Sequence, residues 1–359
     1  MKSDPSESWT SLAEPRDAAG TLLTADQPSK REPLDLNGCN PSALRISIAL
    51  CTYNGERYLR EQLNSIVAQL RLPEEVVVCD DDSSDSTRDI LVSFAAAAPF
   101  KVRIERNLRR LGPTANFERA IRLCTGELIA LCDQDDIWRP EKLFIQAARF
   151  ERDPVLGGLF SNALLVNSES SLMGRTLWQS IDFGSAMQRH VQSGEAGSVL
   201  LSRSVVTGAT LMFRAELVPE VCPIPPSWVH DGWIAWMIAL RSKIDLIPAC
   251  LSYYRIHSFQ ECGVLPSPLQ RIQKEQQAAS LEYLAVVRQL QDLCRYLDDR
   301  AGPAQLFWEP LIQRKIQHLR LRAGLPVNRL SRLLRLLPEF ENYRKFSKGW
   351  KSMLKDIVI

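Results

Sequence analysis

The chain of 359 residues has a hydrophobic content of 45% and a charged content of 24%. Both values are ordinary for a soluble globular protein, so they exclude a chain that is disordered or membrane-embedded throughout. The formal net charge of +2 is unevenly distributed, because the residues from 301 onward carry 12 Lys and Arg against 4 Asp and Glu. The remainder is therefore net acidic, which argues against a nucleic-acid-binding protein and sets apart a basic C-terminal region.

Cysteine usage and the lack of long apolar runs indicate where the protein works. The nine cysteines include no CxxC pair, and several lie inside apolar runs, which predicts a reducing compartment without a disulfide framework. The sequence contains no run of about 18 apolar residues, so we expect no membrane span. The N-terminus also lacks the basic and apolar regions of a signal peptide. We therefore expect a cytoplasmic protein.

In chain order, the sequence divides into three parts. Residues 1–44 are rich in Ser, Asp, Glu, Pro and Ala without sustained periodicity, and we expect them to be a disordered leader. Residues 45–265 alternate short apolar runs with helical patterns and predict a catalytic domain. Residues 266–359 predict a helical, basic extension.

The alternation within the central part predicts the fold. The expected strands are 45–50, 75–79, 102–104 and 128–132, and the expected helices are 59–70, 87–98 and 116–123. Strands and helices at this spacing form βαβ units, so we expect an α/β fold with a mostly parallel, Rossmann-like sheet flanked by helices. Further strands are expected near 159–167, 207–214 and 251–257, and a helix is expected at 233–240.

Three carboxylates follow the strand at 128–132 within four residues, at Asp133, Asp135 and Asp136. Ligands of such sheets bind at the carboxyl ends of the strands, and clustered carboxylates repel one another unless a cation lies between them. Mg²⁺ and Mn²⁺ take oxygen ligands and commonly bind substrate phosphates as well. A solvated acidic loop would explain this segment alone, but polar clusters at other strand ends favour a metal site that holds a diphosphate.

Two of those clusters follow the first two strands. Asp80 and Asp81 could accept hydrogen bonds from a nucleobase or a ribose, or could form a turn that caps the next helix. The segment Thr52, Tyr53, Asn54 could present backbone groups and an aromatic face to a nucleobase, or could simply lead into the following helix.

Together these segments resemble glycosyltransferase family 2, the inverting enzymes with the GT-A fold, and in detail its rhamnosyltransferase-like branch. The resemblance runs from Ile46 to His257 through segments in the same order and spacing. They are ALCTYNGE at 49–56, VCDDDSSD at 78–85, Asn107 with Gly112 and Asn116, DQDDIW at 133–138, HDGW at 230–233 and YRIH at 254–257.

The resemblance implies a site for a nucleotide-diphosphate sugar, with UDP or dTDP as the nucleotide, and Mg²⁺ or Mn²⁺ as the cofactor. It implies that Asp133 lies by the ribose and diphosphate, that Asp135 is the main metal ligand, and that Asp136 lies near the donor sugar. The YRIH segment would close over the diphosphate, with Arg255 binding the donor and His257 joining Asp135 and Asp133 at the metal. The remaining residues of the implied nucleotide-sugar site are Thr52, Tyr53, Asn54, Glu56, Asp80, Asp81 and Asn116.

The resemblance also implies the reaction. Asp231 matches the family's catalytic base, which takes the proton of an acceptor hydroxyl during a one-step, inverting attack on the anomeric carbon. A helix cap before Gly232 is the alternative for this aspartate. The implied acceptor is a glycan or a lipid-linked glycan, in polysaccharide or O-antigen-type biosynthesis.

Two departures from the family pattern keep another reading open. Asp82 stands where glycine is usual in the turn after the second strand, and SFQ at 258–260 replaces the usual glycine and asparagine after His257. A catalytically degenerate relative that binds a nucleotide sugar or glycan without turnover is therefore the alternative. A nucleotidyltransferase would show a glycine-rich phosphate loop after the first strand, and none is present.

The basic C-terminal region allows two interpretations. A helix with Leu330, Leu333, Leu334 and Leu337 among arginines could lie on an anionic membrane surface, at the inner face of the cytoplasmic membrane, or could pack on the catalytic domain with a solvated basic face.

Overall fold

The computed structural model describes residues 44–258, 275–300, 302–326 and 328–358. The predicted disordered leader, residues 1–44, lies outside these ranges except for Leu44. The predicted boundary between residues 265 and 266 also lies outside them, so the division into domains stays a prediction.

The first half of the sheet is parallel, as the alternating pattern predicts. Its strands run in the order β3-β2-β1-β4, and every neighbouring pair is parallel. All residues of β1, β2 and β4 are buried, as expected for strands covered on both faces. The elements are β1 (Ile46–Thr52), α1 (Leu59–Val67), β2 (Glu75–Asp80), α2 (Thr87–Ala97), β3 (Lys101–Arg106), α3 (Pro113–Leu123) and β4 (Leu128–Cys132).

Helices cover the two faces of this half because successive residues of each strand point to opposite sides. On one face Ile48 and Leu50 of β1 share a hydrophobic cluster with residues of α1 and α2. On the other face Ala49 and Cys51 share a cluster with Phe117 and Ile121 of α3. The continuous apolar runs in the sequence reflect this burial on both sides.

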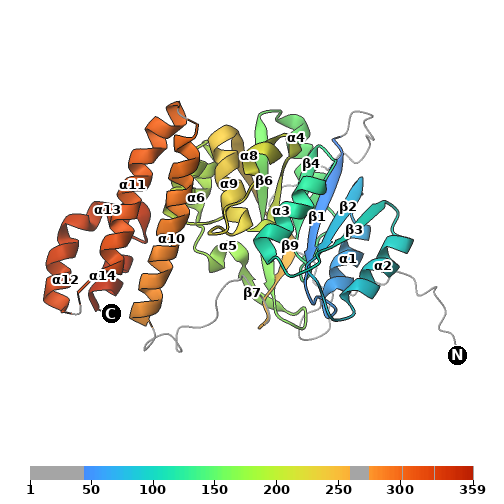
Figure 1. The fold of residues 1–359 in the computed structure, drawn as a ribbon, viewed down its shortest axis with the longest axis horizontal. Helices are drawn as coiled ribbons and strands as arrows, with labels where there is room; N and C mark the ends of the chain where they lie inside the picture. Colours follow the sequence, from blue (N-terminus) through green and yellow to red (C-terminus); the bar gives the residue numbers. More distant parts are fainter. Residues whose placement is uncertain (1–43, 259–274, 301, 327, 359) are drawn as a thin grey trace.

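The second half of the sheet is mixed. The order continues β8-β6-β9-β5, with β7 paired to β6 at the side, and only the β6–β9 pair is parallel in this half. The strands are β5 (Ile137–Trp138), β6 (Leu156–Val166), β7 (Leu172–Thr176), β8 (Leu211–Arg214) and β9 (Lys243–Arg255). The predicted parallel pairing therefore holds for β1 to β4, and the α/β fold flanked by helices is confirmed (Figure 1).

The sequence patterns did not reveal most of the helices between β5 and β9. Apart from α4, which is as long as α2 and α3, these are elements of eight residues or fewer, too short to show a sustained pattern. They are α4 (Lys142–Arg152), α5 (Leu177–Ser180), α6 (Ser185–Gln192), α7 (Ala196–Ser202), η1 (Gly208–Thr210), η2 (Ala215–Leu217) and α8 (Val218–Val221). The helix predicted at 233–240 is α9 (His230–Arg241), which begins three residues earlier. Its first turn therefore includes the predicted catalytic base, Asp231.

The C-terminal region is helical, as predicted, and its first two helices join the core of the catalytic half. Leu293 of α10 and Ile312 and Ile316 of α11 are buried in the hydrophobic cluster that contains α9, and Trp308 packs edge-on against Trp236 at 5.5 Å between ring centroids. The helices are α10 (Glu275–Asp298), α11 (Pro303–Ala323), α12 (Arg329–Leu336), η4 (Leu337–Glu339), α13 (Phe340–Phe346) and α14 (Trp350–Val358).

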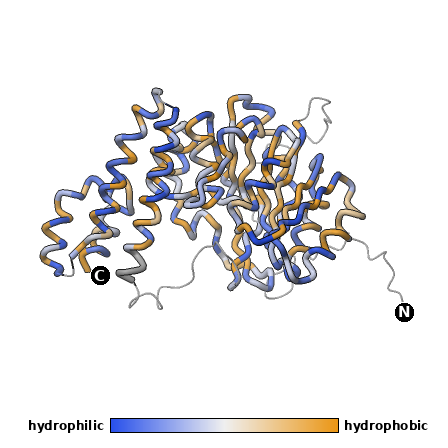
Figure 2. The backbone as a smooth tube through the Cα atoms, in the orientation of Figure 1, coloured by the Kyte–Doolittle hydropathy of each residue, from blue (hydrophilic) through white to orange (hydrophobic). Residues whose placement is uncertain are grey.

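Figure 2 shows the apolar residues concentrated in the sheet, while hydrophilic and hydrophobic residues alternate along the C-terminal helices. Within the described ranges, none of the helices combines the length and the apolar character that crossing a membrane requires.

Candidate functional site

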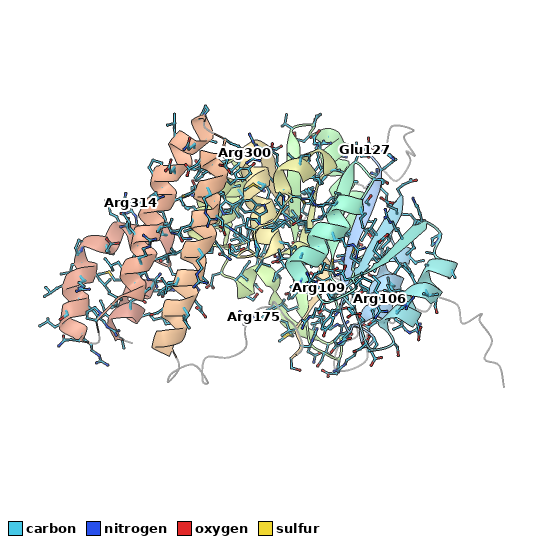
Figure 3. The ribbon with its side chains drawn as sticks, in the orientation of Figure 1. Arg106, Arg109, Glu127, Arg175, Arg300 and Arg314 are labelled. Atoms are coloured by element: carbon cyan, nitrogen blue, oxygen red, sulfur yellow. The ribbon has the colours of Figure 1, made fainter. Side chains whose placement is uncertain are left out.

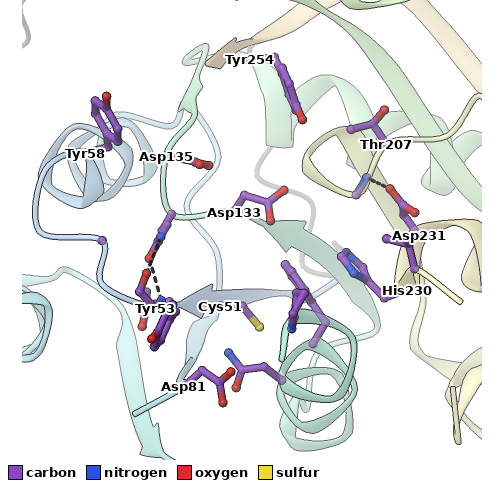
Figure 4. A pocket seen from close by; sticks show the side chains of 18 of the residues that line it. Cys51, Tyr53, Tyr58, Asp81, Asp133, Asp135, Thr207, His230, Asp231 and Tyr254 are labelled. Atoms are coloured by element: carbon purple, nitrogen blue, oxygen red, sulfur yellow. Dashed lines mark hydrogen bonds between the residues drawn. The ribbon is translucent and has the colours of Figure 1, made fainter. Parts of the chain in front are cut away.

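A cleft with a volume of about 1010 Å³ opens at the carboxyl ends of β1, β2 and β4 (Figure 4). This is the place where α/β sheets bind their ligands. Ten of the predicted site residues line it: Thr52, Tyr53, Asn54, Glu56, Asp81, Asn116, Asp133, Asp135, Asp231 and His257. Three others, Asp80, Asp136 and Arg255, lie behind the lining.

The wall of the cleft formed by β1, β2 and α3 is a closed hydrogen-bond network. The Asp81 carboxylate accepts bonds from Asn107 Nδ2 (2.6 Å) and from the backbone amides of Leu111 (2.7 Å) and Gly112 (2.8 Å). Asn116 donates to the Cys79 carbonyl at 2.8 Å. Because Asn107 and the two backbone amides donate to the Asp81 carboxylate, it is held at the cleft wall in one orientation.

Asp80 lies deeper and supports this wall. Its Oδ1 accepts a bond from Thr52 Oγ1 at 2.8 Å, and its Oδ2 accepts one from the Ser83 amide at 3.0 Å. The side chain is 2% exposed. This geometry joins the ends of β1 and β2, and it leaves the predicted contact between Asp80 and the nucleoside a prediction.

The loop after β1 is tied to both neighbouring strand ends. The Gln134 amide accepts from the Tyr53 amide at 2.9 Å and donates to the Tyr53 carbonyl at 3.0 Å, and the Arg110 guanidinium lies 4.0 Å from the centre of the Tyr53 ring. Asn54 accepts from the Ser84 amide at 2.9 Å, and Glu56 accepts from the Ser86 amide at 3.0 Å. The sequence pattern gave no signal for the role of Gln134.

Asp82 replaces the expected glycine and takes up the conformation that glycine would have. Its φ is 63°, in the left-handed region where aspartate is one of the better-tolerated residues. Its carboxylate forms an ion pair with Arg106 at 2.7 Å, and Arg106 is labelled at the end of β3 in Figure 3. The turn after β2 therefore forms with aspartate in place.

The acidic segment after β4 brings three carboxyl groups close together at the floor of the cleft. Limited access to water and the nearby carboxylates of Asp135 and Asp231 raise the pKa of Asp133 to about 8. Burial and the neighbouring carboxyl groups of Asp135 and Asp133 also raise the pKa of Asp136 well above its usual range. The Asp136 Oδ1 atom accepts from the Arg255 amide at 3.0 Å, whereas its Oδ2 atom is buried without a partner among the described residues. A cation bound beside these carboxyl groups would stabilise their ionised forms.

Two predicted metal ligands meet at the rim of this segment. His257 Nε2 lies 2.8 Å from Asp135 Oδ2, and both side chains are largely buried but open to the cleft. Over the described part of the chain, no three His, Cys, Asp or Glu side chains form a ready cluster, so the predicted set of three with Asp133 is not brought together. A carboxylate and an imidazole still fit Mg²⁺ or Mn²⁺, because such ions commonly complete their shell with substrate phosphates and water.

Arg255 supports the acidic segment from behind. Its guanidinium is fully buried and donates to the Asp135 carbonyl (2.7 Å), to Ser170 Oγ (2.8 Å) and to Glu61 Oε2 (2.6 Å). The guanidinium also lies 4.5 Å from the centre of the Tyr58 ring, which packs on His257 at 4.8 Å between ring centroids. Donor binding by Arg255 stays a prediction, and the geometry gives this residue a role in holding Asp135 and His257.

Asp231 lies on the opposite wall, in the first turn of α9. Its Oδ2 atom accepts from the Gly208 amide at 3.0 Å and its Oδ1 from the Gly232 amide at 2.6 Å. Val229 occupies the N-cap position, so Asp231 is not the helix cap that was the alternative interpretation. In Figure 4 its carboxylate and that of Asp133 lie on opposite sides of the same cavity.

His230, which had been noted only as part of the HDGW segment, is the most unusual polar group in the cleft. Its ring stacks on Phe117 with 4.0 Å between centroids, is 6% exposed, and lines the cleft. Neither ring nitrogen has a hydrogen-bond partner among the described residues. Burial lowers its pKa below the ordinary 6.5, so the imidazole is neutral at physiological pH, with one donor and one acceptor available.

Comparison with known proteins identifies the family. The sequence model of glycosyl transferase family 2 matches residues 47–200, and an uncharacterised protein of Mycobacterium tuberculosis is 34% identical over 231 residues, which cover 60% of this chain and 68% of that protein. The chain belongs to glycosyltransferase family 2.

Other family members match over smaller shares of their length. An uncharacterised glycosyltransferase of Nostoc sp. is 29% identical over 222 residues, 60% of this chain and 65% of that protein. An Escherichia coli β-1,3-glucosyltransferase described as acting from UDP-Glc on α-D-GlcNAc-diphosphoundecaprenol is 29% identical over 125 residues, 35% of this chain and 48% of that enzyme. The chain thus spans less than two thirds of the length of both.

Comparison with solved structures confirms the predicted GT-A fold. The TarS 1–349 structure from S. aureus, in complex with UDP-GlcNAc, superposes with a TM-score of 0.50 at 20% identity and covers 86% of this chain and 92% of its own. The mannosyltransferase PcManGT of Pyrobaculum calidifontis, in complex with GDP-Man and Mn²⁺, gives a TM-score of 0.50 at 17% identity and covers 91% and 89%. At these identities the likeness concerns the fold alone.

Proposed function

We propose that the protein is an inverting glycosyltransferase that moves a sugar from a nucleotide-diphosphate donor to a hydroxyl of an acceptor glycan. The observation that carries the proposal is the placement of Asp231 and the acidic segment Asp133–Asp136 on facing sides of one cleft. One side can hold a leaving diphosphate, and the other can deprotonate an incoming hydroxyl.

On the donor side, the nucleoside would lie along the loop after β1, where Thr52, Tyr53 and Asp81 line the cleft. The diphosphate would then reach Asp135 and His257, which would hold Mg²⁺ or Mn²⁺ together with it. When bound, the ion neutralises charge on the leaving diphosphate. The complexes of TarS with UDP-GlcNAc and of PcManGT with GDP-Man and Mn²⁺ support this choice of ligands.

On the acceptor side, Asp231 would receive the proton of the attacking hydroxyl. The acceptor oxygen forms a bond to the anomeric carbon while the bond from that carbon to the β-phosphate oxygen breaks, so nucleoside diphosphate departs and the configuration inverts. The amides of Gly208 and Gly232 fix both carboxylate oxygens of Asp231, which positions the base before the substrate arrives.

The acceptor is proposed by class only. The E. coli relative acts on a sugar linked to diphosphoundecaprenol, which supports a glycan or lipid-linked acceptor in polysaccharide or O-antigen-type biosynthesis at the cytoplasmic side of a membrane. Rhamnose or another hexose is the proposed sugar, carried by UDP or dTDP.

The test is nucleoside diphosphate release from a panel of nucleotide sugars, with Mn²⁺ or with a chelator, in the presence of candidate lipid-linked acceptors. We expect release that depends on the acceptor and on the metal. Full activity in chelator would refute the metal role. Tight donor binding with no release over the whole panel would instead support the non-catalytic relative.

A further inference from the structure

Helix α12 exposes a row of leucines to solvent. Leu330, Leu333, Leu334 and Leu337 are exposed by 66%, 37%, 64% and 57%. Their spacing of three and four residues places them on one face of the helix. Phe340, at the start of α13, continues the apolar surface at 50% exposure. Exposed apolar groups that gather in this way usually mark a surface that contacts another body.

The opposite face of α12 is firmly packed, so the outward direction of the leucines is fixed. Leu336 is fully buried and Arg332 is 3% exposed. The Arg332 guanidinium donates to the carbonyl oxygens of Pro326 (2.5 Å) and Asp356 (3.1 Å). Arg322 holds Asp356 from the other side at 2.6 Å. These bonds tie α12 to α11 and α14 and leave its leucines unpartnered among the described residues.

The surroundings of the leucines are strongly basic. The exposed cations of α12 to α14 are Arg329, Arg335, Arg344, Lys345, Lys351 and Lys355. Among the described residues of these helices and η4, only Glu341 is an exposed acid, and it pairs with Arg314 of α11, labelled in Figure 3. Asp356 is buried in the network just described. Helix α14 adds exposed apolar groups beside its lysines, namely Trp350, Leu354 and Val358.

We propose that this basic leucine face, formed by α12 with the start of α13, docks on the surface of a bilayer that contains anionic phospholipid. Such a short amphipathic helix binds at the level of the lipid headgroups. Its leucine and aromatic groups contact the acyl chains there, and its Lys and Arg side chains contact the anionic headgroups. Each cation near an anionic leaflet adds to the attraction.

The charge of the basic leucine face favours an anionic membrane as its partner over a second copy of the chain. A symmetric dimer through this face would bring the same patch of both copies together, because a two-fold interface pairs a surface with itself. The exposed arginines of α12, Arg329 and Arg335, would then repel their counterparts on the other copy, whereas an anionic leaflet attracts them. The proposal concerns a surface away from the cleft, so it holds or fails independently of the proposed reaction.

The experiment is co-sedimentation of the full chain with vesicles of phosphatidylcholine alone or with added phosphatidylglycerol, without any substrate. We expect binding to the anionic vesicles that weakens with salt. The double variant Leu333→Gln/Leu334→Gln should bind about tenfold more weakly, and Arg329→Glu/Arg335→Glu should lose the preference for anionic lipid.

The matched control is Leu108→Gln/Val155→Gln, which removes exposed apolar groups, at 100% and 69% exposure, from the catalytic half. It should bind the anionic vesicles as the wild type does. Equal binding of the leucine variant and the wild type, or no wild-type binding, would overturn the proposal. A wild-type dimer in light scattering that becomes monomeric in the leucine variant would assign the face to self-association instead.

Discussion

The two walls of the cleft are built on opposite principles. On the donor wall, Asp80 and Asp81 are saturated with hydrogen bonds from their own protein, so their orientation is fixed in the absence of a ligand. On the wall formed by α9, the buried ring nitrogens of His230 have no hydrogen-bond partner within the described ranges, and the Asp231 carboxylate accepts from two backbone amides.

The difference indicates what each wall contributes to the protein. A saturated wall contributes rigidity and shape, and its loss should affect folding together with binding. A wall with buried, unpaired polar groups is less stable than it could be, and such strain persists where a ligand relieves it. We therefore expect a substitution on the donor wall to lower the stability of the fold. Replacing His230 on the opposite wall should raise stability while transfer falls.

The largest effect is expected for Asp231→Asn. An amide cannot take the proton of the acceptor hydroxyl, and general bases contribute about 10²–10⁴-fold to rates. Transfer should fall by that range, as measured by nucleoside diphosphate release, and urea denaturation should confirm that the variant is folded. Asp299→Asn, at an exposed position after α10, is the control and should retain activity. Wild-type transfer by Asp231→Asn would exclude the base assignment.

On the donor wall, Asp81→Asn should destabilise the fold. The carboxylate accepts three hydrogen bonds, and an amide nitrogen in its place would face donors, so the unfolding free energy should fall by about 2–3 kcal/mol. Urea denaturation measures this change. An unchanged unfolding midpoint would show that the network around Asp81 is not the rigid element of the wall.

On the opposite wall, His230→Leu should raise the stability of the fold and lower the rate of transfer. Leucine removes two buried nitrogens that have no partner among the described residues, so stability should rise by about 1 kcal/mol. Transfer should fall, because we expect the donor and acceptor of this imidazole to bond a sugar hydroxyl in the cleft. His230→Gln, which restores a donor and an acceptor, should recover part of the transfer. Lower stability of the leucine variant with full activity would assign His230 a purely structural role.

The same histidine predicts a pH dependence of stability. Because burial lowers its pKa in the folded protein below the ordinary 6.5, the unfolded chain binds a proton at a pH where the folded one does not. This contribution to stability is therefore present above pH 6.5 and is lost as the pH falls toward the folded pKa. The advantage of His230→Leu over wild type should grow from pH 7 to pH 5 in denaturation experiments, and a constant difference would contradict the assignment.

The smallest effect is expected for Asp82→Gly. Glycine relieves the left-handed backbone at φ 63° but removes an exposed ion pair with Arg106 and loosens the unfolded chain. These terms offset, so stability should change by less than about 1 kcal/mol and transfer should persist. A large loss of transfer would show that aspartate at this position contacts the donor.

The fold was predictable where burial is local to a segment. Strands β1, β2 and β4 are buried along their whole length because helices cover both faces, so their central residues are mostly apolar, and the polar residues at their carboxyl ends mark the cleft. The antiparallel insertion of β8 between β4 and β6 depends on pairing between distant segments, which no local pattern encodes. Likewise α5 and α7 have four and seven residues and show no sustained periodicity.

Some features of the site could likewise be predicted from local sequence, and others could not. Carboxylates at strand ends could be found from their position, whereas the unpaired state of His230 and the link from Gln134 to Tyr53 depend on which residues the fold brings beside them. Buried Lys142 is another such case. Its ammonium donates to the Ala209 carbonyl at 2.6 Å, and burial lowers its pKa to about 8. Nothing in the sequence around Lys142 signals either feature.

The measurement that tests the division of labour most directly compares donor affinity in two variants. Titration calorimetry with a nucleotide sugar and Mn²⁺ would give the donor Kd of Asp135→Asn, Asp231→Asn and the wild type. We predict a donor Kd at least about tenfold weaker for Asp135→Asn, as expected when a metal-binding group is lost, and an unchanged Kd for Asp231→Asn. Equal Kd values for Asp135→Asn and the wild type, or loss of donor binding in Asp231→Asn, would contradict the account.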